Sequence, residues 1–97
     1  MNENTKIDES RVDDWIYQEI LSDTLASLVG GYFNLAFAEE EKEEPNKKNI
    51  EKWEMRKREI MMISDGLFVS EKTYEEVQEL TAIYSKEDKE VDKLRGI

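Results

Sequence analysis

Apolar residues recur at intervals of three and four positions in three segments of the chain, with polar residues between them. This spacing is typical of amphipathic helices. The first segment is the longest and runs to a carboxylate cluster at 39–44, the second follows Pro45, and the third follows Gly66. The chain shows neither a strand pattern nor an internal repeat. The pattern therefore predicts an all-α protein, a small three-helix bundle with a long N-terminal helix.

Capping and breaking residues indicate where the first helix begins and ends. Ser10, with Asp13 three residues later, resembles a capping box and predicts the start of the helix. The carboxylates at 39–44 oppose the negative C-terminal end of the helix dipole. We therefore expect the helix to fray there and a loop to run through Pro45 and Asn46.

The second helix is predicted to start at a cap formed by Asn46 or Asn49. Its apolar residues are Ile50, Trp53, Ile60 and Ile63. Asp65 and Gly66 end it, with Gly66 in the left-handed conformation that commonly follows a helix.

The third helix is predicted to start at Ser70, with Val69 packing on Tyr74 across the cap. Its residues at helical spacing are Tyr74, Val77, Leu80, Thr81 and Tyr84. The region 85–97 either forms a fourth short helix, with Val91 and Leu94, or continues the third.

The long first helix carries two apolar stripes on different sides, at about 100° per residue. The late stripe consists of Leu21, Leu25, Leu28, Tyr32 and Ala36. The early stripe, nearly opposite, consists of Val12, Trp15, Ile16 and Ile20. Phe33 and Phe37 lie on the flank between the two. Either the helix breaks near Ser22–Asp23 and both stripes pack inward, or the early stripe contacts a partner. Aromatic side chains at such a surface are typical of binding hot spots.

The pair Gly30–Gly31 lies inside this helix, where each glycine costs about 1 kcal/mol relative to alanine. Two explanations are open, close approach of another helix or a real break. The pair does not form a phosphate-binding loop, because no strand precedes it and no Lys-Ser/Thr follows it.

Composition removes several kinds of chemistry. The 97 residues include no Cys and no His, so disulfides, the commonest zinc ligands and nucleophile–imidazole pairs are excluded. The adjacent acids Asp13 and Asp14 point to different sides of a helix and form neither a shared-proton dyad nor a metal clamp. We expect a protein that is not an enzyme and has no cofactor.

The length predicts one domain, a helical bundle over 10–97 with a flexible N-terminus at 1–9. The first ten residues have no apolar segment and do not resemble a signal peptide. No stretch approaches the roughly 18 uncharged apolar residues of a membrane span. The lack of Cys agrees with a reducing compartment. We therefore expect a cytoplasmic protein with no membrane partner.

Negative charge is concentrated in the first half of the chain. Residues 1–44 carry a net charge of −9 and residues 45–97 a net charge of −1, within a total of −10. Such a half repels nucleic acid and steers the protein toward a basic partner, although the same charge also serves solubility.

The segment KKNIEKWEMRKR at 47–58 is locally basic around Trp53. Basic residues at this spacing commonly form a solvated helix face, and the flanking regions are acidic, so we do not expect nucleic acid as the partner. The methionines near this segment and beyond it, Met55, Met61 and Met62, are expected to fill the core.

With its striped N-terminal helix, charged loop and two shorter helices, the chain resembles the epsilon antitoxins, which neutralise zeta toxins. The similar region runs from Val12 to Tyr84, and DGLFVSEKTYEEVQELTAIY at 65–84 is similar to the closing part of such proteins. The resemblance implies a three-helix bundle whose N-terminal helix blocks the ATP site of a P-loop kinase that phosphorylates UDP-N-acetylglucosamine.

The resemblance places part of the N-terminal helix at the position of the blocking helix. These residues are Asp13, Asp14, Trp15, Ile16, Tyr17 and Ile20. Together with the flanking Phe33 and Phe37, they are the candidate partner-binding residues. The expected partner is a larger cognate protein, a zeta-type toxin kinase.

Other classes of inhibitor remain as alternatives. Inhibitors of Fic adenylyl transferases end a helix with Ser/Thr-x-x-x-Glu-Gly, whereas this chain has Met61 and Asp65 at the first two specified positions, before Gly66. An inhibitor that mimics DNA would carry carboxylates over its whole surface, and the second half of this chain is nearly neutral. A small adaptor or secretion chaperone is the remaining alternative.

Overall fold

The computed structural model describes residues 3–67 and 72–97, and within these ranges it describes the side chains of residue 16 and of residues from 18 onward. The three helices are α1 (Glu3–Glu40), α2 (Lys47–Gly66) and α3 (Tyr74–Arg95). No strand occurs in the part of the chain that is described. The predicted all-α bundle with a long N-terminal helix is confirmed.

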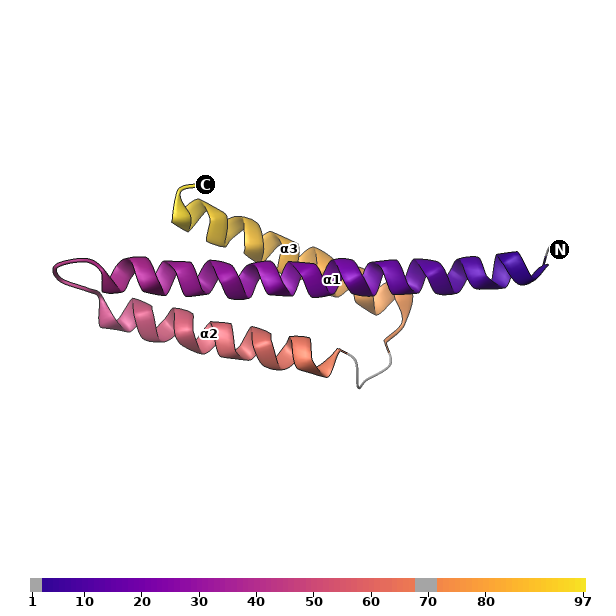
Figure 1. Ribbon diagram of the computed structural model, residues 1–97, viewed down its shortest axis with the longest axis horizontal. Helices are drawn as coiled ribbons and strands as arrows, with labels where there is room; N and C mark the ends of the chain where they lie inside the picture. Colours follow the sequence, from indigo (N-terminus) through magenta and orange to yellow (C-terminus); the bar gives the residue numbers. More distant parts are fainter. Residues whose placement is uncertain (1–2, 68–71) are drawn as a thin grey trace.

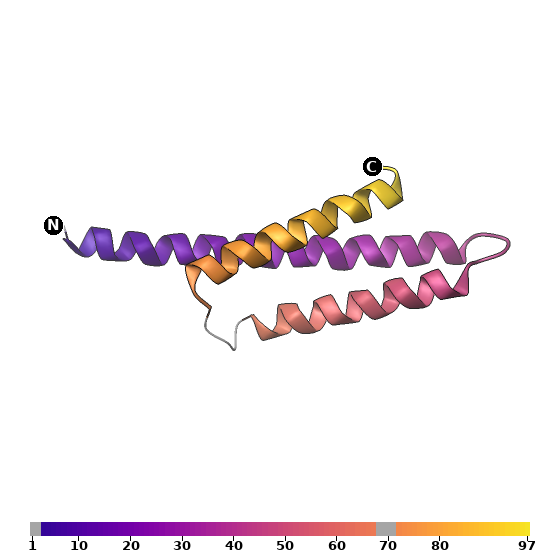
Figure 2. The ribbon, with the colours of Figure 1, turned by 180° about the vertical axis from the view of Figure 1, so that it is seen from behind.

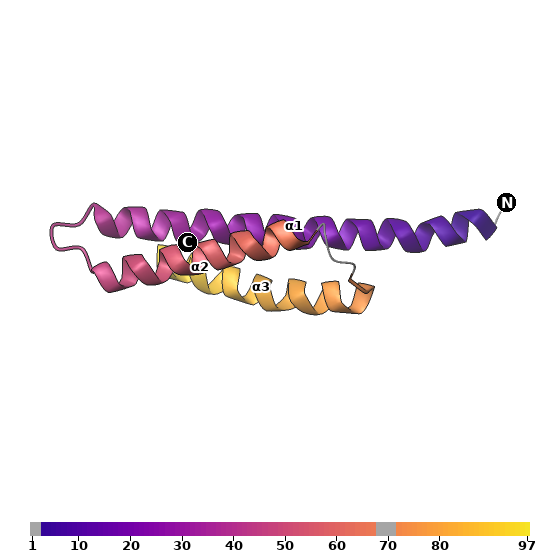
Figure 3. The same ribbon diagram turned by 90° about the horizontal axis from the view of Figure 1, so that it is seen from below.

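Helix α1 is the axis on which the other two helices pack. Helix α2 turns back antiparallel along α1, and α3 crosses α1 while running in roughly the same direction as it (Figures 1 and 2). Among the described residues, no Cα of α2 lies within 8 Å of a Cα of α3. The molecule is elongated, 66 × 26 × 16 Å, because α1 continues beyond both partners at its N-terminal end (Figure 3).

The late stripe of α1 forms the core, as the sequence predicts. Leu21, Leu25 and Leu28 are fully buried, and Tyr32 and Ala36 nearly so. The buried cluster also contains Leu35 of α1, Ile60 of α2, Leu67, and Val77 and Val91 of α3. Burying one aliphatic side chain of this size contributes about 1.5–3 kcal/mol, so this stripe is the main source of stability.

Helix α1 is continuous, so the alternative with a break near Ser22–Asp23 is wrong. The helix also passes through Gly30 and Gly31, and the two glycines differ. A Cβ added at Gly31 would lie 2.7 Å from Val91 Cγ1 of α3, so the missing side chain permits the close approach of that helix. A Cβ added at Gly30 would meet nothing within 4 Å.

The predicted start of α1 at Ser10 is wrong, because the helix begins at Glu3. A flexible N-terminus at 1–9 stays a prediction. The end of α1 agrees with the sequence more closely. It stops at Glu40, within the carboxylate cluster, and a loop leads to the cap of α2.

Glu39 stabilises the turn between α1 and α2. Its carboxylate is nearly buried and accepts hydrogen bonds from the Asn46 backbone N–H at 3.0 Å and from Lys42 Nζ at 2.9 Å. These two hydrogen bonds lower the pKa of Glu39 below its usual value, and the bond from the Asn46 backbone has the larger effect. Asn46 in turn caps α2 by accepting from the Asn49 backbone N–H, which settles the choice between the two asparagines.

Two helix ends differ from the prediction. The residue after α2 is Leu67 in the right-handed helical region, and Gly66 has no positive φ; the left-handed cap is Gly96, with φ 81°, after α3. Helix α3 begins after Thr73, whose side chain forms a capping box with Glu76. The predicted cap Ser70 and the staple residue Val69 lie outside the described residues. Region 85–97 continues α3 rather than forming a fourth helix.

Candidate partner interface

The N-terminal part of α1, residues 3–20, precedes the first residue of the buried cluster, and its first turns project past the ends of α2 and α3 (Figure 1). We call residues 3–20 the projecting segment. At 1.5 Å per residue this projecting segment is roughly 27 Å long. The first residue of the buried cluster is Leu21, so the described core begins where the projection ends. The segment holds most of the candidate partner-binding residues.

Ile16 and Ile20 are the candidates of the projecting segment whose side chains the structure describes. They are 40% and 42% exposed, which is high for aliphatic side chains in the middle of a helix. The backbone of the other four, Asp13, Asp14, Trp15 and Tyr17, belongs to α1, and their side chains lie outside the described part. Ile16 and Ile20 are therefore available for contact with another molecule.

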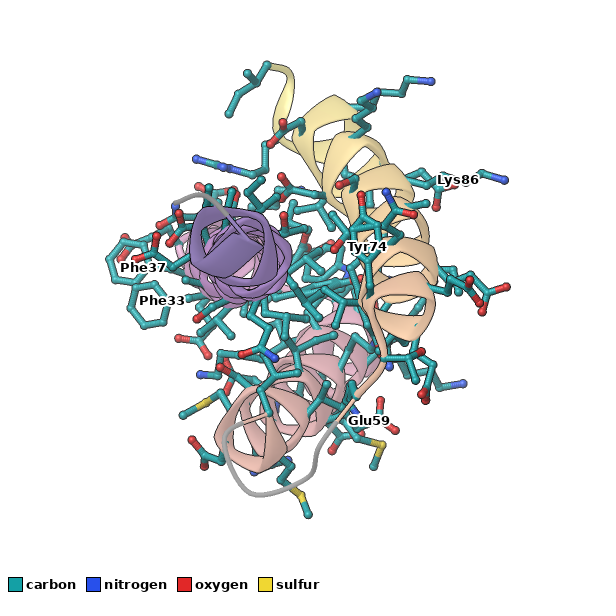
Figure 4. All side chains as sticks on the ribbon, turned by 90° about the vertical axis from the view of Figure 1, so that its right-hand side faces the viewer. Phe33, Phe37, Glu59, Tyr74 and Lys86 are labelled. Atoms are coloured by element: carbon teal, nitrogen blue, oxygen red, sulfur yellow. The ribbon has the colours of Figure 1, made fainter. Side chains whose placement is uncertain are left out.

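Phe33 and Phe37 form a second exposed surface on α1. Their rings stack with centroids 6.2 Å apart and are 51% and 54% exposed, and Lys57 Nζ of α2 lies 5.4 Å from the Phe33 ring centroid. Figure 4 shows both rings pointing away from α3 into solvent. From Ile20 to Phe33 the helix rises roughly 20 Å and the side-chain direction differs by about 140°. The candidate residues therefore form two separate surfaces.

The methionines of α2 contradict their predicted role in the core. Met55, Met61 and Met62 are 62%, 46% and 74% exposed. Their positions fall on the side of α2 that α1 does not cover, while Ile60 takes the buried position between them. Exposed thioethers of this kind are adaptable contact groups, so this surface of α2 is also apolar in part.

A polar junction that the sequence analysis missed joins all three helices. Glu87 of α3 accepts hydrogen bonds from Tyr32 of α1 at 2.5 Å and from Arg56 of α2 at 2.7 and 2.9 Å. These residues are separated by 31 and 55 positions in the chain, and no local pattern brings them together. The junction holds α2 and α3 in place across the gap between their backbones.

The junction shifts the titration of its members. The hydrogen bond from Arg56, together with the weaker effect of Tyr32, lowers the pKa of Glu87 below its usual value although partial burial opposes the shift. Burial, and then the hydrogen bond to Glu87, raise the pKa of the Tyr32 phenol. Both shifts follow from burial and from a carboxylate that accepts from two donors, which is a structural role and requires no reaction.

An open groove of about 790 Å³ lies between α2 and α3, and the residues of this junction form part of its lining. Its apolar lining includes Tyr32, Trp53, Met55, Ile83, Val91 and Leu94. Charged side chains of both signs, such as Lys52 and Glu90, stand at its rim. The groove exists because α2 and α3 each contact α1 and diverge from one another (Figure 2).

Two further tests concern metals and membranes. Within the described ranges, no group of three His, Cys, Asp or Glu side chains is placed to hold a metal ion. Segment Gln18–Glu40 is long and apolar enough to cross a membrane by length and composition alone, although it contains charged residues. The core helix of a soluble protein passes the same test.

Comparison of the chain with models of protein families, with curated proteins and with solved structures finds no match.

Proposed function

We propose that this protein is a non-catalytic inhibitor, an antitoxin of the epsilon type, that binds a zeta-type P-loop kinase and blocks its ATP site with the projecting segment of α1. The observation that supports this proposal is the projection itself. A helix of this length gains little stability on its own in water, and Ile16 and Ile20 remain half exposed. An amphipathic helix that leaves its apolar side chains uncovered is suited to docking in a groove of another protein.

The charges of the segment agree with such a partner. Asp13 and Asp14 lie beside Trp15 in a region that is strongly acidic, whereas a nucleotide site binds phosphates with positive charge. In the proposed complex these acids direct the approach toward the phosphate-binding Lys of the kinase. Trp15 and the isoleucines supply most of the affinity, because buried aromatic anchors dominate interfaces of this kind.

The test is inhibition of the kinase by the purified chain. The kinase to be used is the product of the neighbouring reading frame. This choice applies if that frame encodes G-x-x-x-x-G-K-[ST] after a strand. An HxFx[DE]GNxR sequence in that frame would favour the Fic class instead. Phosphorylation of UDP-N-acetylglucosamine is measured against increasing inhibitor. The wild-type chain should abolish it at an equimolar ratio.

The variant that addresses the mechanism is Trp15→Ala. It should weaken inhibition by about 2 kcal/mol, or about 30-fold, and leave the thermal melt of the isolated chain nearly unchanged. Met62→Ala, at an exposed position of α2, is the matched control and should inhibit like the wild type. Full inhibition by Trp15→Ala, or unfolding of the isolated variant, would contradict a blocking role for the segment.

A further inference from the structure

Helices α2 and α3 each turn one side away from α1, and together these sides form a surface that we call the outer face. It includes the mouth of the groove between the two helices. Its apolar side chains Met55, Ile83 and Leu94 are 62%, 59% and 65% exposed. Figure 4 shows Glu59 and Lys86, two charged residues of this face, directed away from α1. The outer face therefore combines uncovered apolar side chains with charges of both signs.

The charges that α2 places on the outer face are arranged symmetrically around Met55. Glu51 and Arg58 lie to one side of Met55 around the helix, and Lys52 and Glu59 lie to the other side. At about 100° per residue, all four lie within about 60° of Met55. All four side chains are exposed. Each side thus holds one acid and one base, with Met55 close to the midpoint between them.

A second copy of α2, laid antiparallel on the first with the two Met55 side chains in contact, brings opposite charges together. Glu51 of one copy then faces Arg58 of the other. On the other side of the helix, Lys52 faces Glu59, and a two-fold axis repeats both pairs. Among these four charges, only Glu59 has an ion pair within the described residues, a contact of 3.4 Å with Arg56 that leaves its side chain 58% exposed. A parallel arrangement in register would instead oppose each charge to its own copy.

Helix α3 shows the same symmetry on its side of the groove. Its exposed groove residues are Ile83, Lys86, Glu90 and Leu94. In an antiparallel pair of α3 helices centred between Lys86 and Glu90, these two residues face one another. The same register places Ile83 of one copy opposite Leu94 of the other. The nearest like charge to Glu90 of the second copy is Glu87, which is already neutralised by the ion pair of the polar junction.

One two-fold axis serves both helices. Arg56 Nη2 lies 2.7 Å from Glu87 Oε1, and these two residues stand next to the midpoints of the two patterns. An axis that runs across α2 and α3 at this ion pair therefore passes close to both midpoints. We infer that the outer face binds the outer face of a second copy of this chain, with α2 antiparallel to α2 and α3 antiparallel to α3 about this axis.

The acidity of the chain does not oppose this contact. Of the total charge of −10, −9 belongs to residues 1–44, and residues 45–97, which include α2 and α3, carry −1. Helix α2 is roughly 30 Å long, and two helices side by side are roughly 20 Å wide, so the face covers about 600 Å² per copy. The total of about 1,200 Å² is at the lower end of stable interfaces, which predicts a reversible dimer. The projecting segment of α1 stays free for another partner.

The oligomeric state of the full chain tests this inference. Sedimentation equilibrium over a micromolar concentration series should show a reversible monomer–dimer equilibrium for the wild type. Met55→Glu should be monomeric over the same range, because two added carboxylates meet at the axis. Its helical circular dichroism should be unchanged, since Met55 is exposed. Phe37→Glu adds the same charge at a position of α1 that is 54% exposed, and as the matched control it should dimerise like the wild type.

Mixing two variants tests the antiparallel direction. Glu51→Arg opposes two bases at each contact with Arg58, and Arg58→Glu opposes two acids, so each variant alone should dimerise roughly tenfold more weakly or worse. An equimolar mixture of the two variants should restore association as a heterodimer, because the opposed charges then differ in sign again. Trp15→Ala should leave the dimer unchanged, which separates this contact from the proposed function.

Three results would overturn the inference. They are a wild type that stays monomeric at all concentrations, a Met55→Glu variant that dimerises as tightly as the wild type, and a mixture of the two charge variants that associates no better than either alone. A monomeric wild type whose inhibition of the kinase is lost in Met55→Glu would assign the outer face to the kinase and would overturn the inference as well.

Discussion

Both halves of α1 carry apolar residues at helical spacing, but the two halves play different roles. From Leu21 to Glu39 the helix buries a continuous stripe under α2 and α3, whereas Ile16 and Ile20 in the first half remain exposed. The difference lies in the neighbours, because α2 and α3 pack along the second half, whereas the first turns of α1 extend beyond both helices (Figure 3). Apolar periodicity thus identifies a helix face that is suited to burial. It does not tell whether the residues that bury this face belong to the same chain or to a partner.

The largest expected effect contrasts one residue from each half. Leu28→Ala should lower the free energy of unfolding by about 2–5 kcal/mol, because it leaves a cavity in the fully buried core. Ile16→Ala should change it by less than about 0.5 kcal/mol, as is usual for exposed positions. Urea denaturation of the two isolated variants measures both. Equal losses would show that the projecting segment packs on the bundle, and the contrast between the halves would be lost.

The second effect contrasts the two glycines. Gly31→Ala should destabilise the chain by about 1–3 kcal/mol, since the new Cβ meets the stiff Val91 side chain at 2.7 Å. Gly30→Ala should instead stabilise the monomer by up to about 1 kcal/mol through helix propensity alone. Thermal melts at low protein concentration report both changes. A loss at Gly30 equal to that at Gly31 would mean that the outward side of α1 is covered within the monomer.

The smallest effect concerns the polar junction that links the core half of α1 to both other helices. Glu87→Gln should cost about 1–2 kcal/mol at neutral pH, because the variant loses the charge that Arg56 neutralises. The pKa of Glu87 is lowered in the folded protein, so its contribution is present at neutral pH. This contribution to stability begins to fall when the pH drops below about 4.3, the usual pKa of glutamate in an unfolded chain. It is lost completely once the pH has dropped below the lower pKa of Glu87 in the folded protein.

The measurement is the free energy of unfolding as a function of pH. The wild type should lose stability on acidification more steeply than Glu87→Gln, and the two curves should approach one another at low pH. Glu79→Gln, at an exposed position of the same helix, is the control and should follow the wild type. Parallel curves for Glu87→Gln and the wild type would show that the ion pair adds no net stability.

The sequence predicts those parts of the fold that depend on local pattern. The late stripe was predictable because leucines spaced by three and four residues share a helix face. The Asn46 cap was predictable because its side chain satisfies a backbone N–H three residues ahead. Gly66 carries the same local signal as Gly96, yet only Gly96 adopts the left-handed conformation. The conformation after a helix also depends on where the chain must go next, which the local sequence does not contain.

Contacts between distant segments could not be predicted in this way. Glu87 meets Arg56 and Tyr32 because the helices cross at one point, and helical periodicity does not specify a crossing. The same limit explains the methionines, since Met61 and Met62 directly follow the buried Ile60 but face solvent. For the candidate interface, the sequence indicated an early stripe, of which Ile16 and Ile20 are exposed, and it did not indicate that Phe33 and Phe37 form a surface of their own.

The separation of the α2 and α3 backbones has a consequence for how the chain folds. Each of these helices packs on α1, and within the described residues their Cα atoms stay more than 8 Å apart, so α2 and α3 cannot form a hairpin without it. The short loop after Glu40 makes the α1–α2 hairpin the most local contact in the molecule and therefore the cheapest in chain entropy. Helix α3 then adds to an existing template. On the ribosome, where the N-terminal part emerges first, α1 is complete before either of the helices that depend on it.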